Sequence, residues 1–341
     1  MTTGESRPGS RAGRASAMAT SGSFRYLSSV DIDALGLTSS NIADAVAAAF
    51  RALGTGGAQS VPKTGFRISP SNFFHAMPAR YDARGTVGIK WIGTADNSAS
   101  GLPHINSMIV LSDARTAVIQ AVMDGTGITA IRPAAVSLVA ARHLARKESR
   151  RMGFIACGQQ ALSHLDAFAA EFPIKQLAFY SRRATTAEAF AAKARARGFA
   201  ATVVTDPRGA VEGQDIVVSS APRGSFPAPF LDPAWVAPGA YVTAVDLARS
   251  WCCEAMRQLD LVTTDNREQS EEESQQPGVL PYRGTYDADL VELVAGKHPG
   301  RTTPEQRAIL IHPGLGLGDV AVAALALELA TTKGIGTIIS R

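Results

Sequence analysis

Hydrophobic positions along this chain follow first a helical period, then a strand-like period, and then an alternation of the two. Residues 41–53 place their apolar positions on one helical face, and Ser39 and Ser40 can cap the start of that helix. Between residues 73 and 111, short apolar runs are separated by polar turns such as residues 95–98. This pattern is typical of antiparallel strands, so we expect a helix followed by an antiparallel sheet.

From residue 131 onward, the pattern predicts helices that alternate with buried strands. An Ala-rich helix is expected over residues 131–144, and two more over residues 162–170 and 186–197. Apolar runs of about five residues, the length of a buried strand, occur at 152–156, 176–180, 201–204, 215–219, 241–245 and 261–264. This series predicts an α/β fold of the Rossmann type, with a doubly wound parallel sheet.

These patterns divide the chain into a tail and two domains. Residues 1–22 are rich in Gly, Ser, Ala and Arg, so we expect a disordered tail, in which Met18 is a second candidate start. An N-terminal α+β domain is assigned to residues 23–130 and 320–341, and is completed by a helix predicted over residues 319–332. The Rossmann domain is assigned to residues 131–319, in which the charged run 267–276 is expected to be an exposed loop.

Composition and charge exclude several classes of function. The 341 residues are 45% hydrophobic, which is enough for two cores, but no apolar run reaches the roughly 20 residues of a membrane span. Three cysteines without paired spacing argue against a zinc site and favour the reducing cytoplasm. A nucleic-acid partner is not expected, because no aromatic residues interleave with the basic cluster of Arg142, Arg146, Lys147, Arg150 and Arg151. We expect no metal site.

The turn after the first parallel strand has part of the signature of a dinucleotide-binding loop. Gly158 would let the backbone approach a pyrophosphate, and Ala161 is small enough for close helix packing, whereas Ala156 stands where the first glycine is usual. The loop and the start of its helix supply the candidate cofactor residues Cys157, Gly158, Gln159 and Gln160.

The end of the next strand bears on the choice between the two nicotinamide cofactors. An acidic residue at this place would bind the ribose hydroxyls of NAD, but the sequence has Ser181, Arg182 and Arg183. A hydroxyl and guanidinium groups suit a 2′-phosphate, so NADP(H) is favoured and NAD(H) remains possible.

Motifs from about residue 61 to the C-terminus resemble those of the ornithine cyclodeaminase/μ-crystallin family. The resemblance is carried, in the family's order, by GIKWIG at 88–93, GLP at 101–103, TAIRPAA at 129–135, VD at 245–246 and the loop 314–319. It implies that the N-terminal domain binds substrate and forms the dimer, and that the site lies between this domain and the Rossmann domain. A homodimer is expected, because the open face of an antiparallel sheet needs a cover.

The resemblance also implies roles for individual residues. Lys90 and Asp246 would be catalytic: Lys90 would hold the substrate carboxylate or assist proton movement at nitrogen, and Asp246 would be a general acid/base. A lysine inside an apolar strand needs a partner. Arg132, expected at a helix start and therefore unfavourable to the helix dipole, would grip phosphate or carboxylate. Lys63 and Arg67 are candidates for a second carboxylate clamp.

The remaining candidates complete two sets of residues. The substrate-binding set is Lys63, Arg67, His75, Lys90, Arg132, Pro313 and Gly314. The cofactor-binding set contains the residues already named around the dinucleotide loop, together with Arg132, Ser181, Arg182, Arg183, Ser219, Ser220, Ala221, Val245, Asp246 and His312. For His75 and His312, a purely structural role is at least as probable on sequence grounds.

The implied function is that of an NAD(P)-dependent oxidoreductase acting on the C–N bond of a small amino acid or its imine. The subgroup most similar in motif is that of N-(2-amino-2-carboxyethyl)-L-glutamate dehydrogenases. One alternative is an ornithine or lysine cyclodeaminase, or a ketimine or imine reductase. Another is a non-catalytic protein that binds a ligand in an NADP(H)-dependent manner, as μ-crystallin does.

Overall fold

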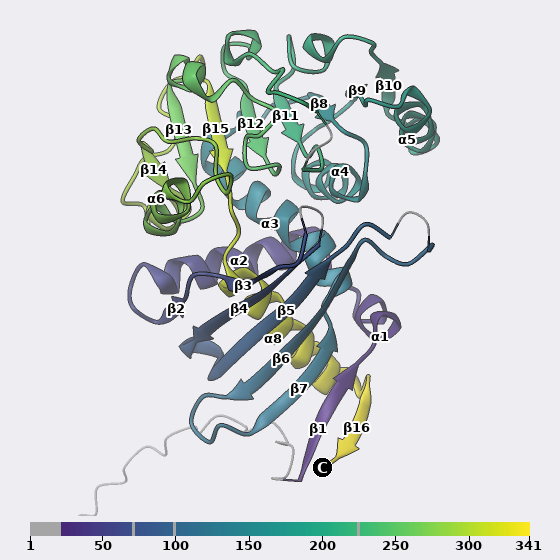
Figure 1. Ribbon diagram of the computed structural model, residues 1–341, viewed down its shortest axis with the longest axis vertical. Coiled ribbons are helices and arrows are strands. Elements are labelled where there is room, and N and C mark those ends of the chain that lie inside the picture. The colour runs from purple at the N-terminus through teal and green to yellow at the C-terminus, as the bar shows by residue number, and fades with distance from the viewer. Residues whose placement is uncertain (1–21, 70–71, 98–99, 224–225) are drawn as a thin grey trace, which may run out of the picture.

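The computed structural model describes every residue except 1–21, 70–71, 98–99 and 224–225. Nearly all of the expected tail, with Met18, and part of the expected turn 95–98 therefore lie outside the described residues. The described chain forms two eight-stranded sheets, and Figure 1 shows them one above the other with helix α3 (Thr126–Leu144) between them.

The upper sheet is wholly parallel, with the strand order β10-β9-β8-β11-β12-β15-β13-β14. Its strands are β8 (Arg151–Ile155), β9 (Gln176–Tyr180), β10 (Ala200–Val203), β11 (Ile216–Ser219), β12 (Tyr241–Ala244), β13 (Leu261–Thr264), β14 (Ala288–Asp289) and β15 (Ala308–Ile311). The chain leaves β8 in one direction and returns to β11 on its other side. The doubly wound fold is thus confirmed, and its topological switch point lies between β8 and β11.

Four α-helices of the described chain connect the strands of the parallel sheet, and the observed helices depart from the prediction at α6 and at the start of α3. The four are α4 (Gln159–Glu171), α5 (Ala184–Ala196), α6 (Arg267–Gln275) and α7 (Leu290–Val294). The expected exposed loop 267–276 is wrong, because α6 is capped by Asn266 and buries Gln269, Ser270 and Glu273. The expected start of α3 is also wrong: the helix begins at Thr126, so Arg132 lies in its second turn and not at its dipole end.

The lower sheet is mixed, with the order β16-β1-β7-β6-β5-β4-β2 and with β3 on β4. Its strands are β1 (Ser23–Leu27), β2 (Ala58–Ser60), β3 (Thr64–Arg67), β4 (Phe73–Tyr81), β5 (Thr86–Thr94), β6 (Ile105–Asp113), β7 (Ile119–Asp124) and β16 (Thr337–Ser340). The antiparallel strands β4 to β6 confirm the prediction for residues 73–111, whereas β1, β2, β3, β7 and β16 lie outside that stretch and were not expected.

One face of the mixed sheet is covered by helices. These are α2 (Ser39–Leu53) and α8 (Gly316–Lys333), and the short α1 (Ser29–Ala34) lies near β1 and β7. Thr38 caps α2 through the amide of Asn41, so the predicted capping by Ser39 or Ser40 is wrong by one residue. No helix in the described part of the chain is long and apolar enough to cross a membrane. The remaining helices are the 3-10 turns η1 (Asp82–Arg84), η2 (Pro207–Ala210), η3 (Pro233–Trp235) and η4 (Cys253–Gln258).

The other face of the mixed sheet is apolar and open. Along β5, side chains alternate between the helix-covered face, where Lys90 is buried, and the outer face, where Val87, Ile89 and Trp91 are 42%, 36% and 44% exposed. The register places Met108 of β6 directly beside Trp91 on the same outer face. Exposed apolar patches of this kind mark interaction surfaces.

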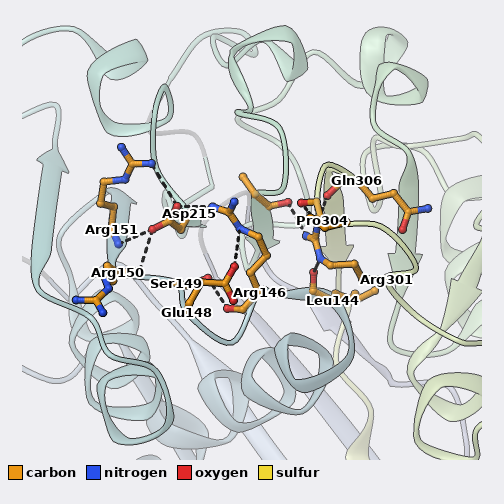
Figure 2. A network of polar contacts seen from close by, with 11 residues as sticks. Leu144, Arg146, Glu148, Ser149, Arg150, Arg151, Asp215, Arg301, Pro304 and Gln306 are labelled. Carbon is orange, nitrogen blue, oxygen red and sulfur yellow. Dashed lines mark hydrogen bonds and ion pairs between the residues drawn. The ribbon is translucent and has the colours of Figure 1, made fainter.

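The basic cluster at the end of α3 has a structural use, which Figure 2 shows. Asp215, just before β11, accepts hydrogen bonds from the backbone amides of Arg150 and Arg151 and from the guanidinium of Arg146 (2.6 Å). Arg142 pairs with Glu171 and Asp44. These contacts tie α3 to the amino ends of β8 and β11, at the edge of the sheet opposite the switch-point side.

Candidate active site

The loop from β15 to α8 connects the two sheets, and the first buried charges of the site lie beside it. Lys90 of β5 is 1% exposed, and its Nζ donates to Oδ1 of Asp319 in the first turn of α8 at 2.8 Å. The Nε of Arg132 reaches the same oxygen at 3.3 Å. Two cations therefore share one buried carboxylate, which leaves a net positive charge suited to an anionic ligand.

The ammonium of Lys90 is the most strongly perturbed cation of this group. Burial is the main cause that lowers the pKa of Lys90, the charge of Asp319 opposes it, and the charge of Arg132 adds to it, so that the pKa is about 8 instead of 10.5. A lysine with a pKa near neutrality can both bind an anion and exchange a proton.

The loop that joins β15 to α8 closes around Arg132. Gly314 has φ +88, and a Cβ there would lie 3.0 Å from Nη1 of Arg132, so the backbone approaches the guanidinium closely. The amide of Gly314 donates to Asp265 at 2.8 Å, which fixes the loop against the end of β13. Burial raises the pKa of Asp265 to about 6.

Lys63 links the β3–β4 hairpin to this loop and to α6. Its Nζ donates to the carbonyl oxygen of Pro313 (3.0 Å) and pairs with Glu273 (3.2 Å), which also accepts from Gln269. His75 of β4 is nearby and half-buried. Burial lowers its pKa, the charges of Lys63 and other cations lower it further, and Glu273 raises it. The predicted substrate residues Lys63, His75, Lys90, Arg132, Pro313 and Gly314 are thus brought together.

Asp246 lies just beyond β12 and is 4% exposed. Its two carboxylate oxygens accept hydrogen bonds from the hydroxyls of Ser219 (3.0 Å) and Ser250 (2.6 Å), and Trp251 donates to Ser219 in turn. Burial raises the pKa of Asp246, and these hydrogen bonds oppose the rise. The carboxylate is therefore fixed in place, with a pKa above its ordinary value.

The backbone after Asp246 is strained. Leu247 and Ala248 both have positive φ, at 62° and 58°, although neither is glycine. Another such residue is Ala156, with φ 70°, at the carboxyl end of β8. Left-handed non-glycine residues are unfavourable by roughly 1–2 kcal/mol each and gather at functional sites. Apart from Ala117, in the turn between β6 and β7, those of the described residues occur at the two strand ends that the sequence assigns to cofactor and catalysis.

No hydrogen bond or ion pair among the described residues joins Lys90 directly to Asp246. Two charged side chains lie close enough to act on both groups. Arg67 and Glu273 shift the pKa of His75, near Lys90, and also that of Arg249, near Asp246. The carboxyl ends of the parallel strands face the mixed sheet (Figure 1), so Asp246 and Lys90 belong to facing parts of the fold.

The turn after β8 fits a dinucleotide. Ala156 adopts the left-handed conformation that the usual glycine would take, and its amide donates to the carbonyl of Tyr180. Gly158 precedes α4, and a Cβ on it would meet nothing within 4 Å. Helix α4 has no side-chain cap, so its first amides are available to an anion. These features are those of a phosphate cradle at the switch point.

Other predicted cofactor residues line the ends of neighbouring strands. The amide of Ser220 donates to the carbonyl of Ile155, which holds the ends of β11 and β8 together, and Ala221 follows. Cys157 is buried, and Gln160 donates to Ala130. The positions after β9 are partly or fully exposed: Ser181, Arg182 and Arg183.

His312, at the end of β15, belongs to a buried polar chain. Its Nε2 lies 3.4 Å from the hydroxyl of Ser137, which also contacts His164 (2.9 Å) and Thr243 (2.7 Å). Burial lowers the pKa of His312 well below its usual value, and Arg132 lowers it further. His312 is therefore a neutral imidazole beside the charged group.

Three residues of this arrangement were not predicted. Asp319, Glu273 and Asp265 are buried acids whose partners come from distant segments; Lys90 and Asp319 are 229 residues apart. Only the loop 314–319 gave a signal for Asp319. Several buried polar atoms here have no hydrogen-bond partner in the described structure: Asp319 Oδ2, Glu273 Oε2, His312 Nδ1 and Ser220 Oγ. No group of His, Cys, Asp or Glu in the described part is arranged to hold a metal.

Comparison with known proteins agrees with this arrangement. Residues 25–334 match the model of the ornithine cyclodeaminase/mu-crystallin family. Alanine dehydrogenase from Archaeoglobus fulgidus is 31% identical over 86% of this chain and 91% of that protein. N-((2S)-2-amino-2-carboxyethyl)-L-glutamate dehydrogenase from Staphylococcus aureus is 26% identical over 78% of this chain and 81% of that protein. The structure of an archaeal alanine dehydrogenase dimer with bound NAD aligns with a TM-score of 0.79 and 27% identity, covering 93% of this chain and 99% of that one.

Proposed function

Because this chain belongs to the ornithine cyclodeaminase/mu-crystallin family, we propose that it is a nicotinamide-dependent oxidoreductase that acts on the C–N bond of a small amino acid or its imine. The observation that carries the proposal is the presence of two separate buried groups in facing parts of the fold. One is Lys90 and Arg132 around Asp319, and the other is the fixed carboxylate of Asp246. A dinucleotide-type turn lies on the same side of the parallel sheet as Asp246.

Lys90 and Arg132 would bind the carboxylate of the substrate. Each donates to Asp319, and a second carboxylate would be attracted by the positive charge that Asp319 leaves uncompensated. Both cations are buried, so their interaction with an anion is screened little by water. This contact would orient the α-carbon before any proton moves.

Asp246 would hold or remove a proton at the substrate nitrogen. Burial raises its pKa, which brings the carboxyl group closer to the pH at which it can act as both acid and base. Ser219 and Ser250 hold its two oxygens, so the group does not need to reorganise during the proton transfer.

The turn after β8 would hold the pyrophosphate of the cofactor, through the backbone at Gly158 and the first amides of α4. A bound nicotinamide supplies the chemistry of hydride donation and acceptance. We propose that NADP(H) is favoured and NAD(H) is usable, since Ser181, Arg182 and Arg183 follow β9 where an acidic residue would select NAD. The archaeal alanine dehydrogenase has NAD bound, so the relatives do not by themselves argue for NADP.

We propose further that the protein is a homodimer that buries the outer face of the mixed sheet. The support is the exposed apolar row along β5 and its neighbours, together with the dimeric state of the archaeal alanine dehydrogenase. The domain boundaries at residues 130 and 319 are part of the same proposal.

The test is a titration with NADPH and NADH by fluorescence, followed by turnover with both oxidised cofactors and a panel of amino acids. The panel contains alanine, ornithine, lysine and the glutamate–diaminopropionate conjugate, so its result separates dehydrogenase from cyclodeaminase. Asp246→Asn should lower kcat by about 10²–10⁴-fold, and exposed Glu254→Gln, in a nearby segment, should leave kcat unchanged. Failure of the protein to bind either nucleotide would contradict the proposal.

A further inference from the structure

Arginines from separate segments gather beside Asp246. Arg223 follows β11 and donates to the carbonyl of Gly278 at 3.0 Å. Arg249 follows β12 and donates to the adjacent carbonyl of Val279 at 2.8 Å and to that of Asp246 at 3.4 Å. Two guanidinium groups are thus held next to each other by neutral acceptors.

Arg67, at the end of β3, adds a third positive charge from the mixed sheet. Burial and the charges of Arg223 and Arg67 together lower the pKa of Arg249 to about 10, against the opposing charges of Asp246 and Glu273. Burial and the charge of Arg67 lower the pKa of Arg223 as well. The three side chains therefore share one region of positive potential, in which a bound anion would be stabilised.

The carboxylates of this region make hydrogen bonds and ion pairs with groups other than Arg223 and the guanidinium of Arg249. Those that act on Arg249 are Asp246 and Glu273. Asp246 accepts from two serine hydroxyls, and Glu273 is paired with Lys63. Among the described residues, no ion pair joins Arg223 or Arg249 to an acid. The half-buried guanidinium of Arg249 has only carbonyl partners and would be stabilised by an anion, which the exposed guanidinium of Arg223 beside it can also contact.

We propose that Arg67, Arg223 and Arg249 form a second carboxylate subsite, so that the substrate is an amino dicarboxylate, or the corresponding imine, and not a neutral amino acid. This inference rests on the proposed function, in which Lys90 and Arg132 bind the first carboxylate. The second subsite lies on the other side of the reacting centre, next to Asp246. It joins Arg67 to two arginines of the parallel sheet that the sequence did not single out.

The kinetic test compares acidic with neutral substrates. With NADPH and ammonia, oxaloacetate and 2-oxoglutarate should give a higher kcat/KM than pyruvate. Arg223→Gln and Arg67→Gln should each lower kcat/KM for the acidic substrates by about tenfold to hundredfold, the range expected for one charged hydrogen bond, and leave that for pyruvate nearly unchanged. Arg208→Gln, which removes an exposed arginine paired with Glu212, is the matched control.

A binding test does not depend on turnover. Succinate should bind more tightly than butyrate, which has the same number of carbons and one carboxylate, and Arg223→Gln should abolish the difference. Equal affinities, or a wild-type preference for pyruvate, would overturn the subsite and leave the oxidoreductase proposal intact. If the variants bind NADPH more weakly and lose activity equally with all substrates, the subsite is overturned, and the arginines contact a phosphate of the cofactor instead. Tight succinate binding without any turnover would support the subsite and contradict the oxidoreductase proposal.

Discussion

Lys90, Arg132 and Asp319 form an arrangement that stability alone does not explain. A buried ion pair is often no better for folding than well-packed apolar side chains, because removing charges from water is costly. Here a second cation is added to the pair, and Oδ2 of Asp319 has no partner in the described structure. Such a group is more readily understood as a binding device than as a stabilising one.

Removing the shared carboxylate should therefore be severe for the fold. Asp319→Asn would leave Lys90 and Arg132 buried without an anion, so we expect a loss of about 3–5 kcal/mol in the free energy of unfolding. Urea denaturation of the purified protein measures this loss. Glu328 lies on the same helix as Asp319 and forms an exposed ion pair with Arg84 of η1. Glu328→Gln, which breaks this pair, should change the free energy of unfolding by less than about 1 kcal/mol. Equal effects of the two substitutions would contradict this account of the buried group.

The lowered pKa of Lys90 predicts how ligand binding depends on pH. Only the protonated ammonium attracts a carboxylate, and the folded-state pKa is about 8 instead of 10.5. The affinity for pyruvate, whose carboxylate does not titrate in this range, should be constant below about pH 8 and fall about tenfold per pH unit above it. Calorimetry measures this affinity, and circular dichroism at the same pH values checks that the protein stays folded. An affinity that persists to about pH 10 would show that Lys90 keeps an ordinary pKa.

Among the elements, the buried strands were predictable and the polar ones were not. Strands β9 and β13 have the expected bounds because parallel strands covered on both faces are rich in apolar and β-branched side chains. Helix α6 was missed because its buried face is made of Gln269, Ser270 and Glu273, whose partners come from elsewhere in the chain. Strand β16 is fully exposed, and only its long-range pairing with β1 defines it.

The same reason limited the prediction of the site. Lys90, Asp246 and Arg132 could be singled out from motifs, because each lies in a local pattern. The partners Asp319 and Glu273 could not, since their importance comes from contacts across more than two hundred residues. The helix-start argument for Arg132 was wrong, and the structure replaces it with a buried contact to Asp319.

The strand–turn–helix unit that begins at β8 allows a paired test of cofactor binding against folding. Gly158→Val should leave the free energy of unfolding within about 0.5 kcal/mol, because a Cβ there meets open space, but should weaken NADPH binding by more than about tenfold. In β8 itself, a Cβ on Gly153 would lie 1.8 Å from the carbonyl oxygen of Ala210, so Gly153→Ala should destabilise the protein by about 1–3 kcal/mol or more. Urea unfolding and fluorescence titration of both variants measure the two quantities. Tight nucleotide binding by Gly158→Val would exclude this turn as the phosphate site.

The assembled molecule presents its mixed sheet to solvent with an apolar row that the proposed dimer covers. Trp91→Glu places a charge in the centre of that row, beside Met108, and should convert the dimer to a monomer. Light scattering after size-exclusion chromatography measures the mass. Val30→Glu, on exposed helix α1, should leave the dimer intact. A wild-type monomer, or a Trp91→Glu dimer, would contradict the proposed interface.

The mixed sheet with its buried cations faces a parallel sheet of the dinucleotide-binding type. This arrangement points to hydride transfer between a nicotinamide and a substrate. The most direct measurement is isotope transfer from NADPH or NADH deuterated at the nicotinamide C4, with mass spectrometry of the amino-acid products formed from a panel of imines and 2-oxo acids with ammonia. Hydride transfer at this site should place deuterium at the α-carbon of at least one product, and Asp246→Asn should abolish that label. A protein that binds the nucleotide tightly yet moves deuterium into no product would be a ligand-binding protein, and the account given for Lys90 and Asp246 would be wrong.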